Sequence, residues 1–168
     1  MAFPPHVDPA ASACPAPPLT METNPMKERV RAVLVTPNDT TLVIKRVRPG
    51  IDPYWVIVGG GVEESDATRE EALLREVREE IAGDAEIVRL FHETENAKGE
   101  KEYFYLARID TWDFDRRTGP EFARTDRGEY ILEEVPLTAE AIANLNLLPR
   151  EISTVLRQAL DRGSLLAV

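Results

Sequence analysis

The sequence predicts a mixed α/β (α+β) fold, in which helices pack against a mixed sheet. Short runs rich in β-branched residues, each bounded by turn residues, are typical of strands. One longer stretch, residues 69–83, instead carries apolar residues at helical spacing. The chain has 168 residues, of which 43% are hydrophobic, and this suits one globular domain with extensions.

The N-terminal part divides into a tail and the start of the domain. Residues 1–25 contain seven of the thirteen prolines and show no periodicity, so we expect a disordered Pro-rich tail before a domain over residues 26–168. Two β-branched runs, 29–36 and 41–47, flank the turn residues Pro37-Asn38-Asp39 and predict a hairpin. Tyr54–Val58 is a further short strand.

The remaining elements follow in order along the chain. Asp66 or Thr68 is a candidate N-cap for the helix, and Gly83 is its expected stop. Residues 85–95 and 101–109 predict a second antiparallel pair, residues 110–128 a polar loop, residues 129–137 a strand and residues 148–160 a closing amphipathic helix.

The composition limits the classes of binding partner that we expect. The formal net charge is −10, which argues against nucleic acid, whose phosphates are bound by basic surfaces. It does not exclude a small phosphorylated substrate, which an acidic site binds through divalent cations. Cys14 is the single cysteine, and there is neither a membrane-length apolar run nor a secretory pattern, so we expect a cytoplasmic protein without a membrane partner. A homodimer is left open.

One helix carries the informative constellation. Glu76, Glu79 and Glu80 fall on one face, and a stripe of Leu74, Val77 and Ile81 falls on another. The helix follows three consecutive glycines, where backbone approaches a ligand without a Cβ in the way. Clustered carboxylates are hard oxygen ligands of the kind that Mg²⁺ prefers. A solvated acidic face is the alternative interpretation.

The segment from Gly60 to Gly83 resembles the Nudix box, written G-x5-E-x7-R-E-U-x-E-E-x-G-U with U apolar. Residues 75–80 (REVREE) match the R-E-U-x-E-E core in full. The first acid is Asp66 instead of Glu, one extra residue precedes the core, and one extra residue separates Glu80 from Gly83. Val58 stands where the family often has proline.

The resemblance implies a Nudix-like α/β/α sandwich with a mixed sheet, and a hydrolase that cleaves a diphosphate linkage in a nucleoside diphosphate derivative or related molecule. It also implies a Mg²⁺ cofactor, with Mn²⁺ as the alternative ion. Glu76, Glu79 and Glu80 would ligate the metal, helped by a backbone carbonyl near Gly60 or Gly61. Arg75 would orient a ligand carboxylate, and Asp66 would cap the helix and fix the glycine segment.

Candidates outside the box are less specific. Arg46 could bind phosphate, together with the backbone of Gly60 and Gly61, and Tyr54 or Trp55 could stack on a base. Because Nudix enzymes often take a general base from a loop outside the box, Glu121 and Glu129 are candidates. His92 fits a half-exposed strand position better than a ligand.

Two other functions compete with hydrolysis. One is a catalytically inactive Nudix-like module that binds a nucleotide-type effector. The other is an acidic structural domain whose carboxylates only solubilise it. The intact set of three glutamates favours the enzyme.

Overall fold

The structure is a computed structural model that describes residues 26–165, so the tail predicted over residues 1–25 lies outside it. Its strands are β1 (Glu28–Val35), β2 (Thr40–Arg48), β3 (Ile51–Gly61), β4 (Asp84–Glu95), β5 (Lys101–Thr111), β6 (Glu129–Pro136) and β7 (Leu147–Leu148). Its helices are α1 (Arg69–Ile81), α2 (Ala139–Ala143) and α3 (Arg150–Asp161), with short 3-10 turns η1 (Phe114–Arg116), η2 (Pro120–Ala123) and η3 (Thr125–Arg127).

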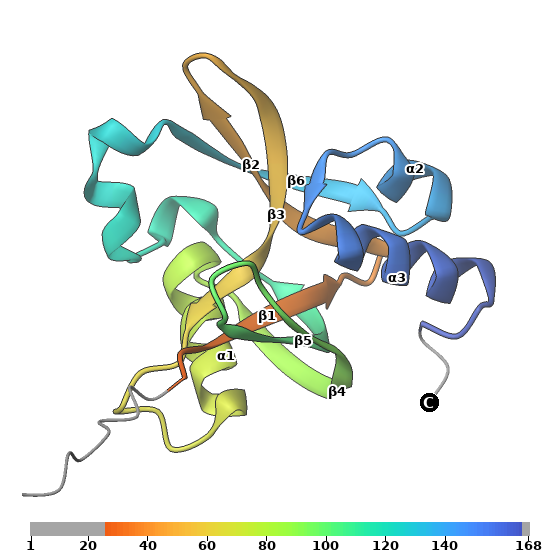
Figure 1. The fold of residues 1–168 in the computed structure, drawn as a ribbon, viewed down its shortest axis with the longest axis horizontal. Helices are drawn as coiled ribbons and strands as arrows, with labels where there is room; N and C mark the ends of the chain where they lie inside the picture. Colours follow the sequence, from red (N-terminus) through yellow and green to blue (C-terminus); the bar gives the residue numbers. More distant parts are fainter. Residues whose placement is uncertain (1–25, 166–168) are drawn as a thin grey trace, which may run out of the picture.

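The described strands form one mixed seven-stranded sheet in the order β4-β5-β1-β2-β3-β7, with β6 also paired to β2 (Figure 1). β1 runs parallel to β5 and β3 runs parallel to β7, whereas the other pairs are antiparallel. β1 also pairs with β3, at Arg29–Gly61 through Ala32–Val58. These pairings bring the glycine end of β3 beside the first half of β1.

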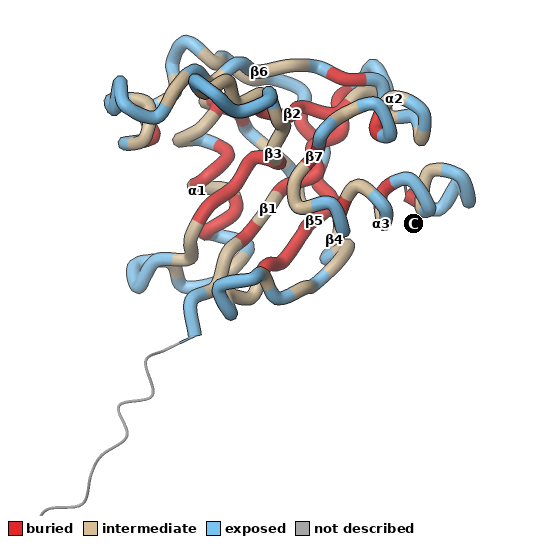
Figure 2. The backbone as a smooth tube through the Cα atoms, turned by 45° about the horizontal axis from the view of Figure 1, so that its top comes forward, coloured by how far each residue is buried: buried red, intermediate tan, exposed pale blue. Residues whose placement is uncertain are grey.

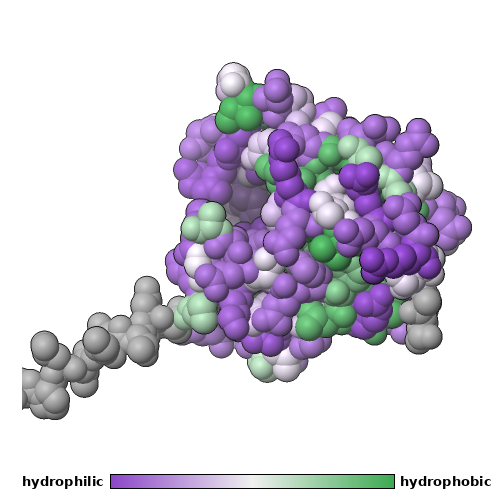
Figure 3. Space-filling view, turned by 45° about the vertical axis from the view of Figure 1, so that its right-hand side comes forward, coloured by the Kyte–Doolittle hydropathy of each residue, from purple (hydrophilic) through white to green (hydrophobic). Residues whose placement is uncertain are grey.

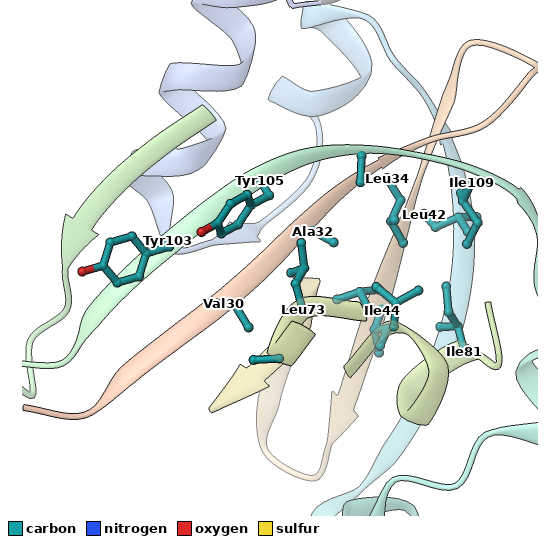
Figure 4. Packing of buried hydrophobic residues seen from close by; sticks show 14 residues of the cluster. Val30, Ala32, Leu34, Leu42, Ile44, Leu73, Ile81, Tyr103, Tyr105 and Ile109 are labelled. Atoms are coloured by element: carbon teal, nitrogen blue, oxygen red, sulfur yellow. The ribbon is translucent and has the colours of Figure 1, made fainter. Parts of the chain in front are cut away.

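Helices cover both faces of the sheet, which confirms the predicted sandwich. One core layer joins α1 to alternate residues of the central strands, and Figure 4 shows Leu73 and Ile81 of the helix beside Val30, Ala32 and Ile44. The opposite layer joins α2 and α3 to the intervening residues. Because successive strand side chains point to opposite faces, a strand covered on both faces is continuously apolar. Figure 2 shows buried stretches along β1, β3 and β5.

The predicted hairpin forms only at its turn. β1 and β2 share a single register pair, Val35 with Thr41, and then diverge. β1 turns to β5 and β3, while β2 pairs along its length with β6 and β3. Sequence proximity therefore predicted the turn correctly but not the partners, because the tertiary pairing of β1 with β5 and β3, and of β2 with β6 and β3, overrides proximity.

The glycines and the helix ends differ from the prediction in detail. Gly59–Gly61 complete β3, which is therefore longer at both ends than the predicted strand Tyr54–Val58. The N-cap is Thr68, whose hydroxyl accepts from the Glu71 N–H. The helix ends at Ile81, and its C-cap is Ala82, which adopts the left-handed conformation with φ of 47°. Gly83 is needed for space, because a Cβ there would lie 2.6 Å from Ile109 Cδ1.

The buried stripe of α1 is also shifted by one residue from the predicted one. Ala72, Leu73, Val77 and Ile81 are buried, whereas Leu74 is only half-buried. The face toward the sheet is thus centred nearer to the glutamates than the apolar residues alone indicated. This rotation buries Glu76 as well.

The C-terminal half contains the predicted β4–β5 pair, the strand β6 and the helix α3. It adds α2 and β7, which were not predicted because each is very short. The polar loop after β5 contains the three 3-10 turns. The face drawn in Figure 3 is mostly hydrophilic. Among residues 26–165, no helix has the length and apolar character needed to cross a membrane.

Candidate active site

A cleft of about 330 Å³ lies where α1 meets the glycine end of β3. Glu76 and Glu80 of α1 and Gly59–Gly61 of β3 line it, and Arg46 of β2 and Glu121 of η2 line it from other elements. The sheet pairing and the α1 packing thus bring together residues that lie far apart in the sequence, such as Arg46 and Glu121. Among the predicted site residues, Arg75, Glu79 and Tyr54 are not part of this lining.

Glu76 occupies the space that a side chain at position 60 would fill. A Cβ at Gly60 would lie between 2.4 and 2.6 Å from the Glu76 carboxyl group. Glu76 is 9% exposed, and Arg75 Nη1 donates to its Oε1 over 3.0 Å. The absence of a side chain at Gly60 therefore fixes where this carboxylate rests.

Glu80 is held by the backbone of β3. The Gly59 N–H donates to Glu80 Oε2 over 2.7 Å, and the Gly59 carbonyl accepts from Arg31 Nη1 over 2.7 Å. Gly59 has φ of 142°, and a Cβ there would lie 2.0 Å from the Val30 carbonyl oxygen, so only glycine fits. Glu102 of β5 pairs with Arg31 at 3.8 Å. A series of contacts therefore connects β5, β1, β3 and α1, through Glu102, Arg31, Gly59 and Glu80 in turn. We call this series the β5–α1 chain.

Arg75 organises the start of the helix and the segment before it. Its Nε and Nη2 donate to the two oxygens of Asp66 over 3.0 and 2.9 Å, and Nη2 also donates to the Gly61 carbonyl. The hydrogen bond from Arg75 holds the pKa of Asp66 below its usual value. Asp66 also accepts from the Glu63 N–H. Arg75 thus links Asp66 to the Gly61 carbonyl, while Thr68 caps the helix.

Glu79 faces a different direction from the other two glutamates. Its carboxylate accepts from Arg75 Nη1 over 3.2 Å and is one third exposed. Its backbone carbonyl accepts from the N–H groups of Thr118 and Gly119, over 2.8 and 3.0 Å. The loop after β5 is therefore tied to the last turn of α1.

Two of the carboxylates lie in surroundings that favour the neutral form. Burial raises the pKa of Glu80 to about 8, although the Gly59 N–H and Arg31 oppose this. Burial also raises the pKa of Glu76, with Arg75 opposing. Burial lowers the pKa of Arg31, and nearby carboxylates counteract it. Desolvated acids at one cleft are a recognised mark of functional sites.

The three glutamates share a helix face but do not converge on one point. Within residues 26–165, no group of three or more His, Cys, Asp or Glu side chains is assembled in a cation-binding geometry. The physical reason is visible in the hydrogen bonds. Arg75 holds Glu76 and Glu79, and Gly59 holds Glu80.

The loop between β5 and β6 closes the far side of the cleft. The Arg127 carbonyl accepts from Arg46 Nη2 over 2.7 Å and from Arg48 Nε over 3.1 Å. The Arg46 guanidinium carbon lies 3.6 Å from the centre of the Tyr130 ring. Glu121 enters the cleft from the same loop, whereas Glu129 does not line it. The structure therefore distinguishes the two candidate bases.

The aromatic candidates and His92 lie elsewhere. Trp55 packs against the core layer opposite α1, and its Nε1 donates to Glu133. Tyr54 is half-buried and does not line the cleft. His92 is bonded to Glu151 of α3 over 2.7 Å, which agrees with an ordinary strand position.

Sequence reasoning missed Arg31 and Arg127. A signal for Arg31 was present: arginines at positions 29 and 31 alternate with apolar residues and so share one face of the strand. A buried arginine needs acceptors, which pointed to a partner within the fold. Arg127 had no such signal, because it lies in a polar loop.

Comparison with protein families agrees with the site. The NUDIX domain model matches residues 26–155, which is most of the chain. The chain therefore belongs to the Nudix family and is a Nudix-type hydrolase. A search of curated proteins finds no match.

Solved structures share the fold at low sequence identity. MutT, described for the fish pathogen Aliivibrio salmonicida and for Vibrio cholerae, is 20% identical with a TM-score of 0.58, over 80% of this chain and 96% of that one. A NUDIX-family hydrolase from Clostridium perfringens is 16% identical with a TM-score of 0.59, over 82% and 97%. An ADP-ribose pyrophosphatase from Streptococcus suis is 18% identical with a TM-score of 0.54, over 79% and 90%. These likenesses establish the fold and not the substrate.

Proposed function

We propose that this protein is a Mg²⁺-dependent hydrolase that cleaves a diphosphate linkage in a nucleoside diphosphate derivative or a related phosphorylated molecule, with Mn²⁺ as an alternative ion. The observation that carries the proposal is the cleft itself. It joins two desolvated carboxylates, Glu76 and Glu80, to a glycine strand end, four arginines and a loop carboxylate, Glu121.

The donor set fits a hard divalent cation. Glu80 makes no ion pair within residues 26–165, and burial raises the pKa of both Glu76 and Glu80, so a bound cation would offset the desolvation of the two carboxylates. Rotation of the Glu79 side chain away from Arg75 would add a third carboxylate, since Glu79 is one third exposed. Carboxylate oxygens with room for waters and phosphates are what Mg²⁺ requires. When bound, the ion would polarise a phosphoryl oxygen and acidify a water.

The residues of the chain supply position and proton transfer. Arg46 lines the cleft and would neutralise a phosphoryl group, and the side-chain-free edge at Gly60 and Gly61 would let the substrate approach the backbone. Glu121 would accept the proton of the attacking water. Arg75 keeps Glu76 and Glu79 in place and does not itself reach the substrate. One P–O bond forms to water oxygen as the bridging P–O bond breaks.

The test is hydrolysis of a panel of nucleoside diphosphate derivatives with Mg²⁺, with Mn²⁺ and with EDTA. We expect turnover only with a divalent cation. Glu121→Gln should lower kcat by about a hundredfold or more, the usual contribution of a general base. Glu129→Gln is the matched control, because Glu129 belongs to the same region but does not line the cleft. Ligand-dependent melting shifts without any turnover would instead support an effector-binding module.

A further inference from the structure

The cleft presents guanidinium groups on either side of its carboxylates. Arg29 and Arg31 of β1, Arg46 of β2 and Arg127 of η3 all line it. The whole chain has a formal net charge of −10, so four arginines at one cleft are a local reversal of its overall character. Such a concentration of cations attracts an anionic ligand.

These arginines differ in how many of their N–H donors already have an acceptor within the protein. Arg31 donates to the Gly59 carbonyl and so has a structural task. Arg29 reaches Glu102 and Glu100 only at 3.7 and 3.9 Å, which is too long for hydrogen bonds. Arg46 has a buried Nε without a hydrogen-bond partner. The Arg127 side chain makes no ion pair within residues 26–165. Three of the four therefore retain free donors.

The cleft offers no open aromatic face for a base. Tyr130 is its one aromatic lining residue among those described, and Arg46 covers one face of that ring at 3.6 Å. Phe122 packs edge-on against the same ring, with 4.8 Å between centroids. Ile44 and Val56 are its remaining large apolar side chains. Stacking, the usual sequence-tolerant way to hold a base, is therefore absent from this part of the structure.

Strand register separates the free cations along the cleft. Arg29 pairs with Gly61 at one end of β3, and Arg46 pairs with Tyr54 toward the other. The carboxylates lie between them, because Glu80 is bonded to Gly59 and Glu76 rests against Gly60. A diphosphate held at the carboxylates thus has a cationic wall beyond each end.

We propose that this cleft selects its substrate by its phosphoryl groups, favouring molecules with three or more of them, and discriminates little between nucleobases. This inference rests on the proposed function, because two of the phosphoryl groups are those of the scissile linkage at Glu76 and Glu80. A further phosphoryl group would accept from Arg46 and Arg127, whose free donors have planar geometry suited to phosphate oxygens.

The experiment compares kcat/KM across a matched set of substrates in Mg²⁺. The set contains the four common nucleoside triphosphates and the corresponding nucleoside diphosphate sugars. We expect the triphosphates to exceed the diphosphate sugars by at least about tenfold, the effect of one charge-assisted contact. Within each class, the four bases should differ by less than about tenfold, because no aromatic ring among residues 26–165 is open for stacking in the cleft.

Two variants test whether Arg127 causes the preference for triphosphates. Arg127→Gln should reduce the ratio of kcat/KM for triphosphates to kcat/KM for diphosphate sugars to near unity. Its backbone carbonyl, which holds Arg46, is retained. Arg124→Gln is the matched control: it removes the same charge from the same loop, but Arg124 pairs with Asp126 at 2.9 Å and does not line the cleft. It should keep the parental ratio.

The outcomes separate the inference from the proposed function. Faster hydrolysis of diphosphate sugars, or a strong preference for one base, would overturn the inference while the hydrolase stands. The same reduction in both variants would show a general effect of charge and would also overturn it. If no member of the set is hydrolysed with either metal, the proposed function itself fails.

Discussion

Adding one methyl group at Gly60 should displace Glu76 without unfolding the protein. A Cβ at Gly60 would lie 2.4 Å from Glu76 Oε1 and 2.5 Å from its Cδ, so the carboxyl group must move. At Gly61 nothing lies within 4 Å, and neither glycine has a positive φ. Gly60→Ala and Gly61→Ala thus make the same chemical change on adjacent residues of β3, and only the first meets an obstacle.

The size of the effect follows from the bonds that Glu76 makes. Moving it breaks the 3.0 Å hydrogen bond from Arg75. A charge-assisted hydrogen bond contributes about 1.5–3 kcal/mol, and partial exposure of Arg75 brings this to about 1–2 kcal/mol. Both variants gain about 0.4–1 kcal/mol through a less flexible unfolded chain. Since that gain cancels in the comparison, Gly60→Ala should be about 1–2 kcal/mol less stable than Gly61→Ala.

The dependence of stability on Mg²⁺ separates the two variants more clearly. Urea melts with EDTA and with millimolar Mg²⁺ measure how far the ion stabilises each variant. Saturating metal at a hundredfold excess over Kd contributes about 2.7 kcal/mol, and each tenfold loss of affinity removes about 1.4 kcal/mol of this. Gly61→Ala should keep the Mg²⁺ stabilisation of the parent, whereas Gly60→Ala should lose about half or more. Equal Mg²⁺ shifts in the two variants would refute the assignment of Glu76 as a ligand.

Three further predictions concern the residues around that ligand. Arg75→Ala should lower kcat without unfolding the protein. Arg75→Lys should restore only part of the activity, because an ammonium cannot replace the planar guanidinium that donates to both Asp66 and Glu76. Parental activity in both variants would show Arg75 to be a surface residue. In EDTA, the free energy of unfolding of Glu79→Gln should lie within about 0.5 kcal/mol of the parental value, since the variant loses only an i,i+4 pair. Mg²⁺ should raise the stability of the variant much less than that of the parent. Equal increases in the two proteins would remove Glu79 from the metal site. Asp66→Asn tests the pH dependence: the pKa of Asp66 is lowered in the folded state, so its contribution is present above the usual value of 3.8 and is lost as the pH falls through the folded value. The stability difference between parent and Asp66→Asn in acid-range urea melts should therefore be largest above about pH 5 and shrink below about pH 3, and a difference that does not change with pH would contradict the ion pair with Arg75.

The sequence was sufficient for the parts of the fold that depend on local pattern. Alternation and β-branching predicted β4, β5 and β6, and the apolar spacing predicted α1 and α3. It failed where tertiary pairing overrides proximity, as in the separation of β1 from β2. It also failed for elements too short to show a period, such as β7.

The prediction of the site also succeeded where it depended on local spacing and failed where it depended on tertiary contacts. The core motif predicted which glutamates share a helix face, because spacing along a helix fixes the face. It did not predict that Glu80 would bond to Gly59, since that contact depends on how closely β3 approaches the helix. The choice of Glu121 over Glu129 as the cleft carboxylate likewise depended on the path of a loop. Loops follow anchoring contacts that composition does not encode, here the bonds from Thr118 and Gly119 to the Glu79 carbonyl.

The β5–α1 chain has a consequence for the order of assembly. Glu102, Arg31, Gly59 and Glu80 come from β5, β1, β3 and α1, and no two of these residues are neighbours in sequence. A partly folded molecule that lacks β3 would leave Glu80 without its hydrogen-bond donor, and one that lacks β1 or β5 would leave the rest of the chain of contacts incomplete. Metal added early should therefore not accelerate folding, whereas metal present afterwards should slow unfolding, because only the completed molecule can retain it. Occupancy by the ion would then report that the whole sheet and its helix are in place.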